Sequence, residues 1–436
     1  MDIAVGGAPS AQMERSILIV GGGTFGTSTA YHLSRRGYNS VTVLDRWAAP
    51  SSEAAGNDIN KVIRADYPEQ LYASLATEAT EIWKDPNGMF GGLYHRCGWL
   101  IAASGISLPF IESSVETAGK LGFEQAQPMS PGAIHKRWPA FTGEMDGWKS
   151  YWNSSAGWAD ARTALSRMAS ATMEAGVKYI SGDAGYVKQL LFDETSTCIG
   201  AKCADGNARF ADVVIVAAGA SAASVLDMKG QLVAKGHTVG HIQLSPEEVE
   251  KYKNIPIVDH LEEGILFPPQ NDGVIKFGAV NFVTNYAKSH PDVSLPRYRS
   301  DNPNDDIPKP HEMQIRKWLK GIIPELADRE WFETRICWDA DMPDYNFLIS
   351  PHPSHPNLKL AVGGSAHGFK FFPVIGKYIV DMLEDKLDPE TAKKWRWRPG
   401  ATLAESAPNP HPTPLKDLNE IPGWAETATA PTTAKS

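Results

Sequence analysis

Cysteine is scarce in this chain of 436 residues, which contains only four, with no pair separated by two residues. Such thiols cannot build a disulfide scaffold, and they lack the paired spacing of a structural zinc site. Because disulfides are typical of oxidising compartments, we expect an intracellular protein, with no metal site. The terminal Ala-Lys-Ser at 434–436 is similar to the Ser-Lys-Leu peroxisomal signal without matching it, so the expected compartment is the cytoplasm or the peroxisome.

Long hydrophobic runs and an excess of basic residues are also missing. The longest apolar stretch, 213–226, includes glycine and serine and is shorter than the roughly 18 residues of a membrane-spanning helix. The first residues lack a basic segment followed by an apolar one, so we expect no secretory signal. The 42 basic and 51 acidic residues give a net charge of −9, whereas a nucleic-acid-binding protein needs a basic face. We therefore expect neither a membrane nor a nucleic-acid partner.

What the chain does contain is typical of a large globular protein. Hydrophobic residues make up 42% of the sequence and charged residues 21%, which allows a large buried core. The length suits two or three domains. Residues 1–15 and the Pro-, Ala- and Thr-rich residues from about 400 onward have little to bury and are expected to be loose.

A βαβ unit is expected near the beginning of the chain. The apolar run 16–20 predicts a buried parallel strand, 27–36 a helix, and 41–45 a second buried strand. Between the first strand and the helix, Gly-Gly-Gly-Thr-Phe-Gly at 21–26 matches the G-x-G-x-x-G pattern of dinucleotide-binding proteins. The order of strand, glycine turn, helix and strand favours a dinucleotide site over an ordinary glycine turn.

Each part of this glycine motif has a chemical purpose. Gly21 permits the tight turn, Gly23 lets the backbone approach a pyrophosphate, and Gly26 lets the helix pack closely against the strand. The N-terminus of the helix then offers free N–H groups to the phosphates. Asp45, 19 residues after Gly26, can accept hydrogen bonds from ribose hydroxyls. The motif alone does not distinguish FAD from NAD.

The middle of the chain predicts a second, different sheet. Residues 240–285 contain short alternating segments that favour a mostly antiparallel sheet. Residues 289–310, which are rich in Pro, Asp, Ser and Asn, predict a long loop that could serve as a lid or a surface crossover.

Three short segments carry residues that could take part in chemistry. Cys337 lies two positions after an arginine, so its thiolate could be stabilised, although a buried structural thiol is the plainer interpretation. The glycine-rich turn at 363–370 ends in Lys370 and could bring a cation to an anionic group, or could simply hold a solvated lysine. Lys61 and Arg64 could share one face of a helix or only aid solubility.

Together these segments resemble the fungal amadoriases, which are fructosyl amino acid and fructosyl peptide oxidases, and the related monomeric sarcosine oxidase. The resemblance covers roughly residues 16–400. It is carried by Gly-Gly-Gly-Thr-Phe-Gly at 21–26, Ala-Gly-Asn-Asp-Ile-Asn-Lys-Val-Ile at 55–63, Ala-Gly-Trp-Ala-Asp-Ala-Arg at 156–162, Arg-Ile-Cys-Trp at 335–338, Gly-Phe-Lys at 368–370 and Trp-Arg-Trp-Arg-Pro-Gly at 395–400.

The resemblance implies an α/β fold, α+β overall, in which a Rossmann-like FAD-binding domain of the glutathione-reductase type is joined to a substrate domain with a mostly antiparallel sheet. The FAD-binding domain would be discontinuous, and the protein would be a monomer. The implied boundaries are 16–95, 150–228 and 334–400 for the FAD-binding domain, 96–149 and 229–333 for the substrate domain, and 1–15 and 401–436 for loose termini.

The resemblance also implies roles for individual residues. Cys337 would attach FAD covalently through a thioether. Lys276 would face the flavin and promote its reaction with oxygen, since a fixed cation stabilises negative charge that develops on O2; without the resemblance, it would be taken for a strand lysine whose head reaches water. Lys61 would lie near the flavin as a second catalytic residue. The implied FAD contacts are Gly21, Gly23, Thr24, Phe25, Gly26, Asp45, Arg46, Asn60, Lys61, Cys337, Gly368, Phe369 and Lys370.

Two departures from the amadoriases bear on the substrate. Amadoriases usually carry an acidic residue a few positions after the flavin-facing lysine, whereas this chain has no acid near Val280. They tend to have a small residue where this chain has Arg64, which with Lys370 resembles the pair that holds the substrate carboxylate in sarcosine oxidase. An arginine fork and a lysine suit a carboxylate. Both departures favour an N-alkyl or N-methyl amino acid over a fructosyl amino acid.

The expected activity is therefore oxidation of the secondary amine of an N-substituted amino acid. A hydride would pass from the carbon beside the amine to flavin N5, the imine would hydrolyse, and O2 would be reduced to H2O2. The alternatives are a fructosyl amino acid substrate, a biosynthetic oxidase whose imine is trapped intramolecularly, an NAD(P)-dependent dehydrogenase, and a non-catalytic FAD-containing protein.

Overall fold

The structure is a computed structural model that describes residues 13–286, 291–403, 408, 410–411 and 415–424. Three predicted features lie wholly or mostly outside this part of the chain: the two loose segments, the terminal Ala-Lys-Ser and the first residues of the predicted loop. Residues 415–424, within the second loose segment, are described and differ from the prediction, because Leu418, Ile421 and Trp424 are buried in one apolar cluster. Among the described helices, none has the length and apolar character needed to cross a membrane.

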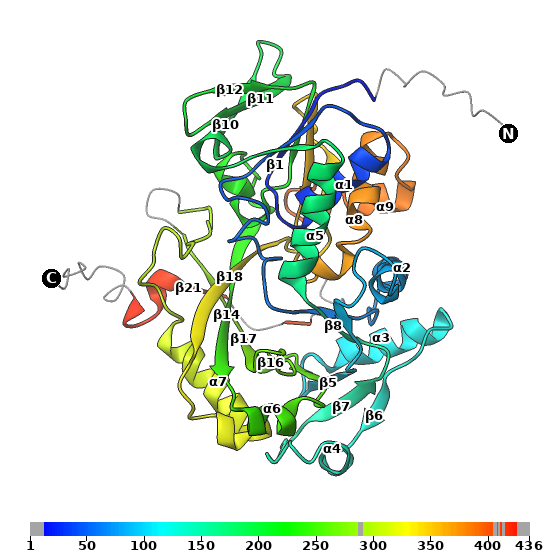
Figure 1. Ribbon diagram of the computed structural model, residues 1–436, viewed down its shortest axis with the longest axis vertical. Helices are drawn as coiled ribbons and strands as arrows, with labels where there is room; N and C mark the ends of the chain where they lie inside the picture. Colours follow the sequence, from blue (N-terminus) through cyan, green and yellow to red (C-terminus); the bar gives the residue numbers. More distant parts are fainter. Residues whose placement is uncertain (1–12, 287–290, 404–407, 409, 412–414, 425–436) are drawn as a thin grey trace.

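A six-stranded sheet forms the upper part of the molecule in Figure 1. Its strands, in spatial order, are β19 (Leu348–Pro351), β20 (Leu358–Val362), β13 (Val213–Val216), β1 (Ile17–Val20), β2 (Val41–Leu44) and β9 (Lys178–Ile180). All neighbours are parallel except β19 and β20. Every residue of β1 is buried, as expected for a parallel strand covered on both faces. The predicted βαβ unit is confirmed.

Three helices pack on this sheet: α1 (Thr24–Arg35), α5 (Ala161–Glu174) and α8 (Ile375–Leu383). Helix α1 contacts both of the others. Its closest approach is to α8, where a Cβ at Gly376 would lie 2.1 Å from the carbonyl oxygen of Ser28. Helix α1 begins before its predicted start at 27, because the last part of the glycine motif is already helical.

A larger, nine-stranded sheet forms the lower part of Figure 1. Its strands, in spatial order, are β18 (Glu333–Asp341), β14 (Val233–Gln243), β17 (Val274–Thr284), β16 (Gly264–Leu266), β15 (Ile257–His260), β5 (Trp99–Ala103), β7 (Lys149–Asn153) and β6 (Gln127–Met129), with β21 (Lys416–Asp417) beside β17. The pairs β15–β5 and β17–β21 are parallel, and the other described pairs are antiparallel. The predicted mostly antiparallel sheet is therefore confirmed.

Two three-stranded sheets and six further α-helices complete the described fold. The small sheets contain β10 (Val187–Phe192), β11 (Cys198–Cys203) and β12 (Ala208–Phe210), and β3 (Lys61–Ile63), β8 (Gly157–Ala159) and β4 (Tyr94–His95). The helices are α2 (Gln70–Lys84), α3 (Leu108–Lys120), α4 (Pro131–Arg137), α6 (Pro246–Tyr252), α7 (Lys309–Ile322) and α9 (Pro389–Lys394). Between β17 and α7, the described residues 291–308 form neither a helix nor a strand.

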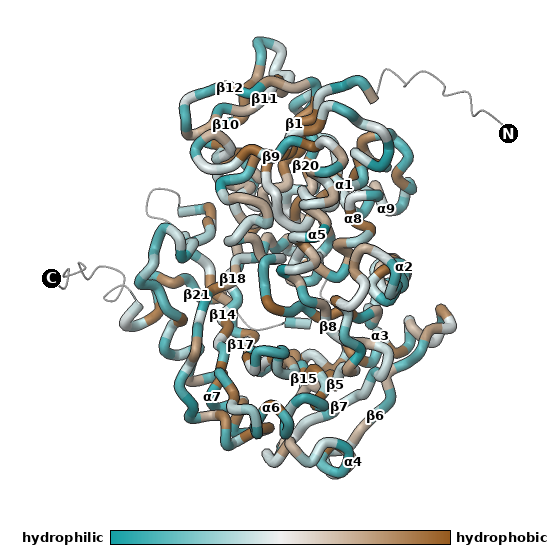
Figure 2. The backbone as a smooth tube through the Cα atoms, in the orientation of Figure 1, coloured by the Kyte–Doolittle hydropathy of each residue, from teal (hydrophilic) through white to brown (hydrophobic). Residues whose placement is uncertain are grey.

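Each of the two large sheets has its own apolar core. One core lies between the upper sheet and its helices, and another lies between the lower sheet and α7. In Figure 2 the hydrophobic colour gathers around β1, β9 and β20 in the interior of the upper part. The two sheets approach each other in the middle of the molecule, and this is where the candidate site lies.

Candidate active site

Two cavities meet where the upper and lower sheets approach each other. The first is lined by the glycine motif and by the carboxyl ends of β1, β2 and β13. The second is lined by residues of β14, β17 and β18 and by the turn at 363–370. Lys61, Asp339, Ala366 and Phe369 line both cavities. The two cavities are therefore parts of one extended site.

The glycine motif brings the backbone close to the first cavity. Gly21 has a φ of +107°, and a Cβ there would lie 2.5 Å from the carbonyl oxygen of Ala217. A Cβ at Gly26 would lie 1.8 Å from the carbonyl oxygen of Gly21. Neither position accepts a side chain, so the N-terminus of α1 stays open to an anion. The predicted cofactor contacts that line this cavity are Gly21, Gly23, Thr24, Phe25, Asp45, Arg46, Lys61, Gly368 and Phe369.

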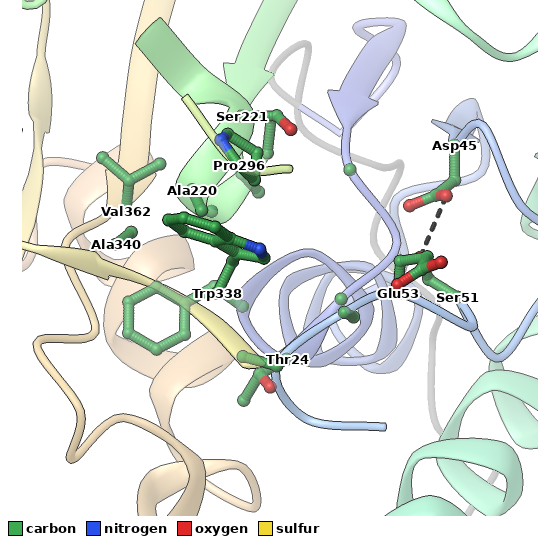
Figure 3. Close-up of a pocket in the computed structure, with 18 of the residues that line it drawn as sticks. Thr24, Asp45, Ser51, Glu53, Ala220, Ser221, Pro296, Trp338, Ala340 and Val362 are labelled. Carbon is green, nitrogen blue, oxygen red and sulfur yellow. Dashed lines mark hydrogen bonds between the residues drawn. The ribbon is translucent and has the colours of Figure 1, made fainter. Parts of the chain in front are cut away.

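Asp45 is fixed beside the glycine motif at the end of β2. Its Oδ2 accepts the Gly22 N–H at 2.6 Å, and its Oδ1 accepts the Trp47 N–H at 2.8 Å and the Ser51 hydroxyl at 3.0 Å. Burial raises the pKa of Asp45, while these hydrogen bonds oppose the rise. Figure 3 shows Asp45 and Ser51 on the opposite side of the cavity from Trp338. The carboxylate is thus positioned to accept hydrogen bonds from a ligand in the first cavity.

The segment 291–308 covers part of the first cavity. Arg46 Nη1 lies 2.7 Å from Asp301 Oδ2, and the hydroxyl oxygens of Tyr298 and Ser221 are 2.8 Å apart. Arg46, a predicted cofactor contact, is therefore paired with a protein carboxylate, although it still lines the cavity. Sequence reasoning did not single out Asp301 or Tyr298, because no local pattern indicates where a long loop will lie.

Asp58 contacts three cations in the wall of the second cavity. Its Oδ2 lies 2.6 Å from Lys276 Nζ and 3.0 Å from Lys61 Nζ, and its Oδ1 lies 2.9 Å from Arg335 Nη2. Although burial opposes ionisation, the charges of Arg335, Lys276 and Lys61 hold the pKa of Asp58 well below its usual range. Sequence reasoning included Asp58 only as one letter of a motif, since two of its partners, Lys276 and Arg335, lie on the distant strands β17 and β18.

Lys276 is buried on β17 and lines the second cavity. Its Nζ donates to Asp58 and, at 3.0 Å, to the backbone carbonyl of Asn60. Burial lowers the pKa of Lys276 to about 8, against the attraction of Asp58. With an exposed fraction of 3%, Lys276 is not a strand lysine whose head reaches water.

Cys337 lies on β18, in the wall of the second cavity. Its Sγ is 3.9 Å from Lys61 Nζ. Burial raises the pKa of the Cys337 thiol, while the charges of Lys61 and Arg335 oppose the rise. Two cations, Lys61 and the predicted Arg335, therefore stabilise the thiolate. The effect of burial on the pKa is larger than the effect of either cation.

Arg64 and Lys370 bring two further basic groups to the second cavity. The Arg64 guanidinium carbon lies 4.7 Å from the ring centroids of both Tyr67 and Trp99. Lys370 Nζ donates to the His367 carbonyl at 3.0 Å, and burial together with Arg64 keeps the pKa of Lys370 well below its usual value. Within the part of the chain that the structure describes, no carboxylate lies within 4.0 Å of either cation.

Two acids of the second cavity have no counterpart in the sequence analysis. Asp259 lies on β15 and Asp339 on β18, and burial raises the pKa of each to about 6. Asp339 Oδ2 is 3.3 Å from His237 Nε2. The one available signal was a polar residue inside an otherwise buried strand, which is too common to mark a site by itself.

Two predicted cofactor contacts, Gly26 and Asn60, line neither cavity. Gly26 acts through the packing of α1 on β1. Asn60 is fully buried, and its side-chain amide has no hydrogen-bond partner among the described residues. Because buried amides are normally paired, we expect a ligand or a water molecule to reach it.

Known proteins match this chain over most of its length. Residues 16–382 match the family of FAD dependent oxidoreductases. L-saccharopine oxidase from Schizosaccharomyces pombe is 33% identical over 409 residues, which span 88% of this chain and 94% of that protein. Monomeric sarcosine oxidase from Arthrobacter sp. is 24% identical over 378 residues, which span 84% of this chain and 92% of that protein.

Solved structures share the fold. Fructosamine oxidase from Aspergillus fumigatus (Amadoriase II) has a TM-score of 0.86 and 36% identity, covering 94% of this chain and 96% of that one. Fructosyl peptide oxidase from E. terrenum has a TM-score of 0.87 and 35% identity, covering 95% and 99%. These similarities confirm the predicted resemblance and the predicted fold class, and they favour FAD over NAD(P).

Proposed function

This chain belongs to the family of FAD-dependent oxidoreductases, and we propose that it is an oxidase of the secondary amine of an N-substituted amino acid. The observation that carries the proposal is the pair Arg64 and Lys370, which line the second cavity together with buried Lys276 and have no carboxylate within 4.0 Å in the described chain. Such a pair suits a substrate carboxylate. Relatives named as oxidases of sarcosine and of N-methyl-L-tryptophan support the proposal.

The residues of the first cavity fit FAD. The missing side chain at Gly21 leaves room for phosphates, and Asp45 can accept from ribose hydroxyls. Outside the cavity lining, Gly26 lets α1 pack on β1, and the buried Asn60 amide has no partner among the described residues. We propose that these residues and Lys61, which lines both cavities, hold the cofactor. When bound, FAD accepts a hydride from the substrate and returns the electrons to O2, which yields H2O2.

We further propose that Cys337 attaches the cofactor through a thioether. Its Sγ lies in the wall of the second cavity, close to Lys61, which also lines the first. The thiolate is the reactive form of cysteine, and although burial raises the pKa of the Cys337 thiol, the charges of Lys61 and Arg335 partly offset that rise.

The proposed role of Arg64 and Lys370 is to bind and orient the substrate. The rings of Tyr67 and Trp99 on the Arg64 guanidinium limit its movement. A carboxylate held by two groups fixes the position of the nearby amine, so that the oxidation step needs little further ordering. Positive charges near the amine also lower its pKa and favour the neutral form, whose electron pair assists loss of a hydride.

The proposed role of Lys276 is to supply a fixed positive charge for the reaction with O2. Its pKa of about 8 keeps the ammonium form dominant at neutral pH, and Asp58 and the Asn60 carbonyl hold the Nζ in place. A cation held in this way stabilises the negative charge that develops as O2 is reduced. Lys61 shares the Asp58 carboxylate and is proposed to contact the cofactor.

Within this class we favour an N-alkyl or N-methyl amino acid over a fructosyl amino acid. Val280, four residues after Lys276, lines the second cavity and is 4% exposed. The amadoriases that this chain resembles usually carry an acidic residue near this position, whereas this cavity offers an apolar side chain there.

The test is peroxide formation from a panel of amines. The panel contains sarcosine, N-methyl-L-tryptophan, L-pipecolate, L-saccharopine, fructosyl-L-valine and fructosyl-L-lysine. Peroxide is expected from at least one N-alkyl amino acid, and its methyl ester, which lacks the carboxylate charge, should be a poor substrate. Arg64→Met and Lys370→Met should raise KM by about tenfold or more, whereas Lys120→Met, at an exposed ion pair, should not.

The outcomes of the panel separate the parts of the proposal. Peroxide from none of the amines would contradict the oxidase function. Peroxide only from the two fructosyl amino acids would contradict the choice of substrate. Unchanged KM values in both cation variants would contradict the carboxylate site.

A further inference from the structure

Asp259 is an acid in a strand made otherwise of core residues. On β15, Ile257, Val258 and His260 are buried, whereas Asp259 is half-buried because it lines the second cavity. The parallel pairing of β15 with β5 brings Trp99 close to its carboxylate. The strand thus places a carboxylate in the cavity in which the substrate is proposed to bind.

The Asp259 carboxylate shares this cavity with Arg64 and Lys370 but contacts neither. Burial raises the pKa of Asp259 to about 6, and both cations are near enough to oppose the rise. Yet among the described residues no cation lies within 4.0 Å of its oxygens. By contrast, Asp341, on β18 of the same sheet, lies 2.6 Å from Lys235 Nζ. A gap in the cavity therefore separates the Asp259 carboxylate from the two cations, Arg64 and Lys370.

A gap of this kind fits a ligand with charges of both signs. A ligand with only a carboxylate would bring like charges together at Asp259. A zwitterion would instead place its carboxylate against the two cations and its ammonium group against Asp259. Building on the proposed function, we propose that Asp259 binds a protonated nitrogen of the substrate whose carboxylate binds Arg64 and Lys370. The ligand class is therefore an amino acid zwitterion and not a simple carboxylic acid.

The protonated nitrogen has two chemical sources. One is the reacting secondary amine in the form in which it first binds; it would pass its proton to the Asp259 carboxylate, leaving a neutral amine and a carboxylic acid. The other is a second amine of the substrate, as in a derivative of lysine. In both cases an ammonium group donates a charge-assisted hydrogen bond to a carboxylate. Matched ligands separate the two sources.

Two pairs of ligands test the proposal on the holoenzyme. (Methylthio)acetate is N-methylglycine with a neutral sulfur atom in place of the charged nitrogen. Nα-methyl-L-lysine and Nα-methyl-L-norleucine differ in the side-chain ammonium group. The dissociation constant is measured without oxygen: for a ligand that reduces the flavin it comes from the concentration dependence of the rate of reduction, and for a ligand that does not it comes from the concentration dependence of the change in the flavin spectrum. The proteins compared are the wild type, Asp259→Asn and Asp259→Glu, with Asp259→Ser in place of the asparagine variant if that variant does not fold.

The wild type should bind the charged member of at least one pair more tightly. Asp259→Asn should reduce that preference by about tenfold to a hundredfold, and Asp259→Glu should keep part of it because it keeps the charge. If Asp259→Asn loses the preference within the first pair, the nitrogen that binds Asp259 is the reacting amine. If it loses the preference within the second pair, that nitrogen is a second amine of the substrate. Binding of (methylthio)acetate by Asp259→Asn should be unchanged or tighter, which also shows that the cavity is intact.

Three results are decisive against parts of this scheme. Equal preferences in the wild type and Asp259→Asn for both pairs would overturn the role of Asp259. If Asp259→Asn binds all four ligands more tightly than the wild type, and to the same extent, this role is also overturned. Asp259 would then only balance the charges of Arg64 and Lys370. Failure of the proposed function is a separate result, in which Arg64→Met and Lys370→Met leave the affinity for (methylthio)acetate unchanged.

Discussion

The position of Asp58 among three cations leads to a prediction about stability. Asp58→Asn keeps the size of the side chain but removes the negative charge that lies 2.6 Å from Lys276, 2.9 Å from Arg335 and 3.0 Å from Lys61. At an effective dielectric constant of about 20, each contact near 3 Å corresponds to about 5 kcal/mol of Coulomb attraction, most of which desolvation offsets. Removing one partner of a buried pair costs about 3–5 kcal/mol. Because one carboxylate serves three cations, we expect a loss of about 5 kcal/mol in the free energy of unfolding.

The measurement is urea unfolding of the holoenzyme at neutral pH and again on the acid side. Lys276→Met is the matched control, since it leaves Asp58 with Arg335 and Lys61 and should therefore cost less. The pKa of Asp58 is lower in the folded protein than its unfolded value of about 3.9. Its contribution is therefore present above about pH 4 and is lost as the pH falls through the folded-state pKa. The wild type should lose more stability than Asp58→Asn over that range.

Two results would refute this reasoning. If Asp58→Asn unfolds with a free energy within about 1 kcal/mol of the wild type, the cost of burying Asp58 cancels the attraction of its partners. If Lys276→Met loses as much as Asp58→Asn, the packing of the lysine, and not the shared carboxylate, determines the stability of this cluster.

The remaining predictions concern Lys276 and Cys337. Lys276→Met should slow reoxidation of the reduced enzyme by O2 by about 100-fold or more, with a much smaller effect on anaerobic reduction; equal effects on both would exclude the oxygen role. Because the pKa of Lys276 is lowered to about 8, wild-type reoxidation should slow as the pH rises through that value and the ammonium group loses its proton, and Lys276→Met should lack this step. After denaturation in acid, the yellow colour should stay with the wild-type polypeptide and pass into the supernatant for Cys337→Ser. Free colour in both would refute covalent attachment.

Much of the upper sheet could be predicted because its signals are local. The continuous apolar runs at 16–20 and 41–45 became β1 and β2. Helix α5 also begins at a local signal, Asp160, whose Oδ1 accepts the Thr163 N–H at 3.0 Å. The order of the strands could not be predicted in this way, since β20 and β13 pair across a long stretch of sequence. The domain boundaries and the monomeric state implied by the resemblance stay predictions.

The sequence motifs identified the cations of the second cavity but not its acids. Lys61, Arg64 and Lys370 lie in short segments whose order along the chain carries the resemblance. The function of a carboxylate depends instead on the charges that the fold brings within a few ångströms of it. Asp58 meets Lys276 only because β17 passes beside the segment before β3, and no local pattern contains that contact.

The placement of the acids divides one charged region into two functional parts. Where Asp58 touches Lys276, the carboxylate fixes the ammonium group and cancels part of its charge, which suits a residue that must stay in one place. Arg64 and Lys370 have no such contact within 4.0 Å in the described chain, so their charge is available to a ligand. Had the fold paired all of these cations equally, a substrate carboxylate would gain little from this cavity. Had it paired none, the cost of burying like charges together would oppose folding. The counter-ions, more than the cations, therefore determine which end of the site can bind the carboxylate of the proposed substrate.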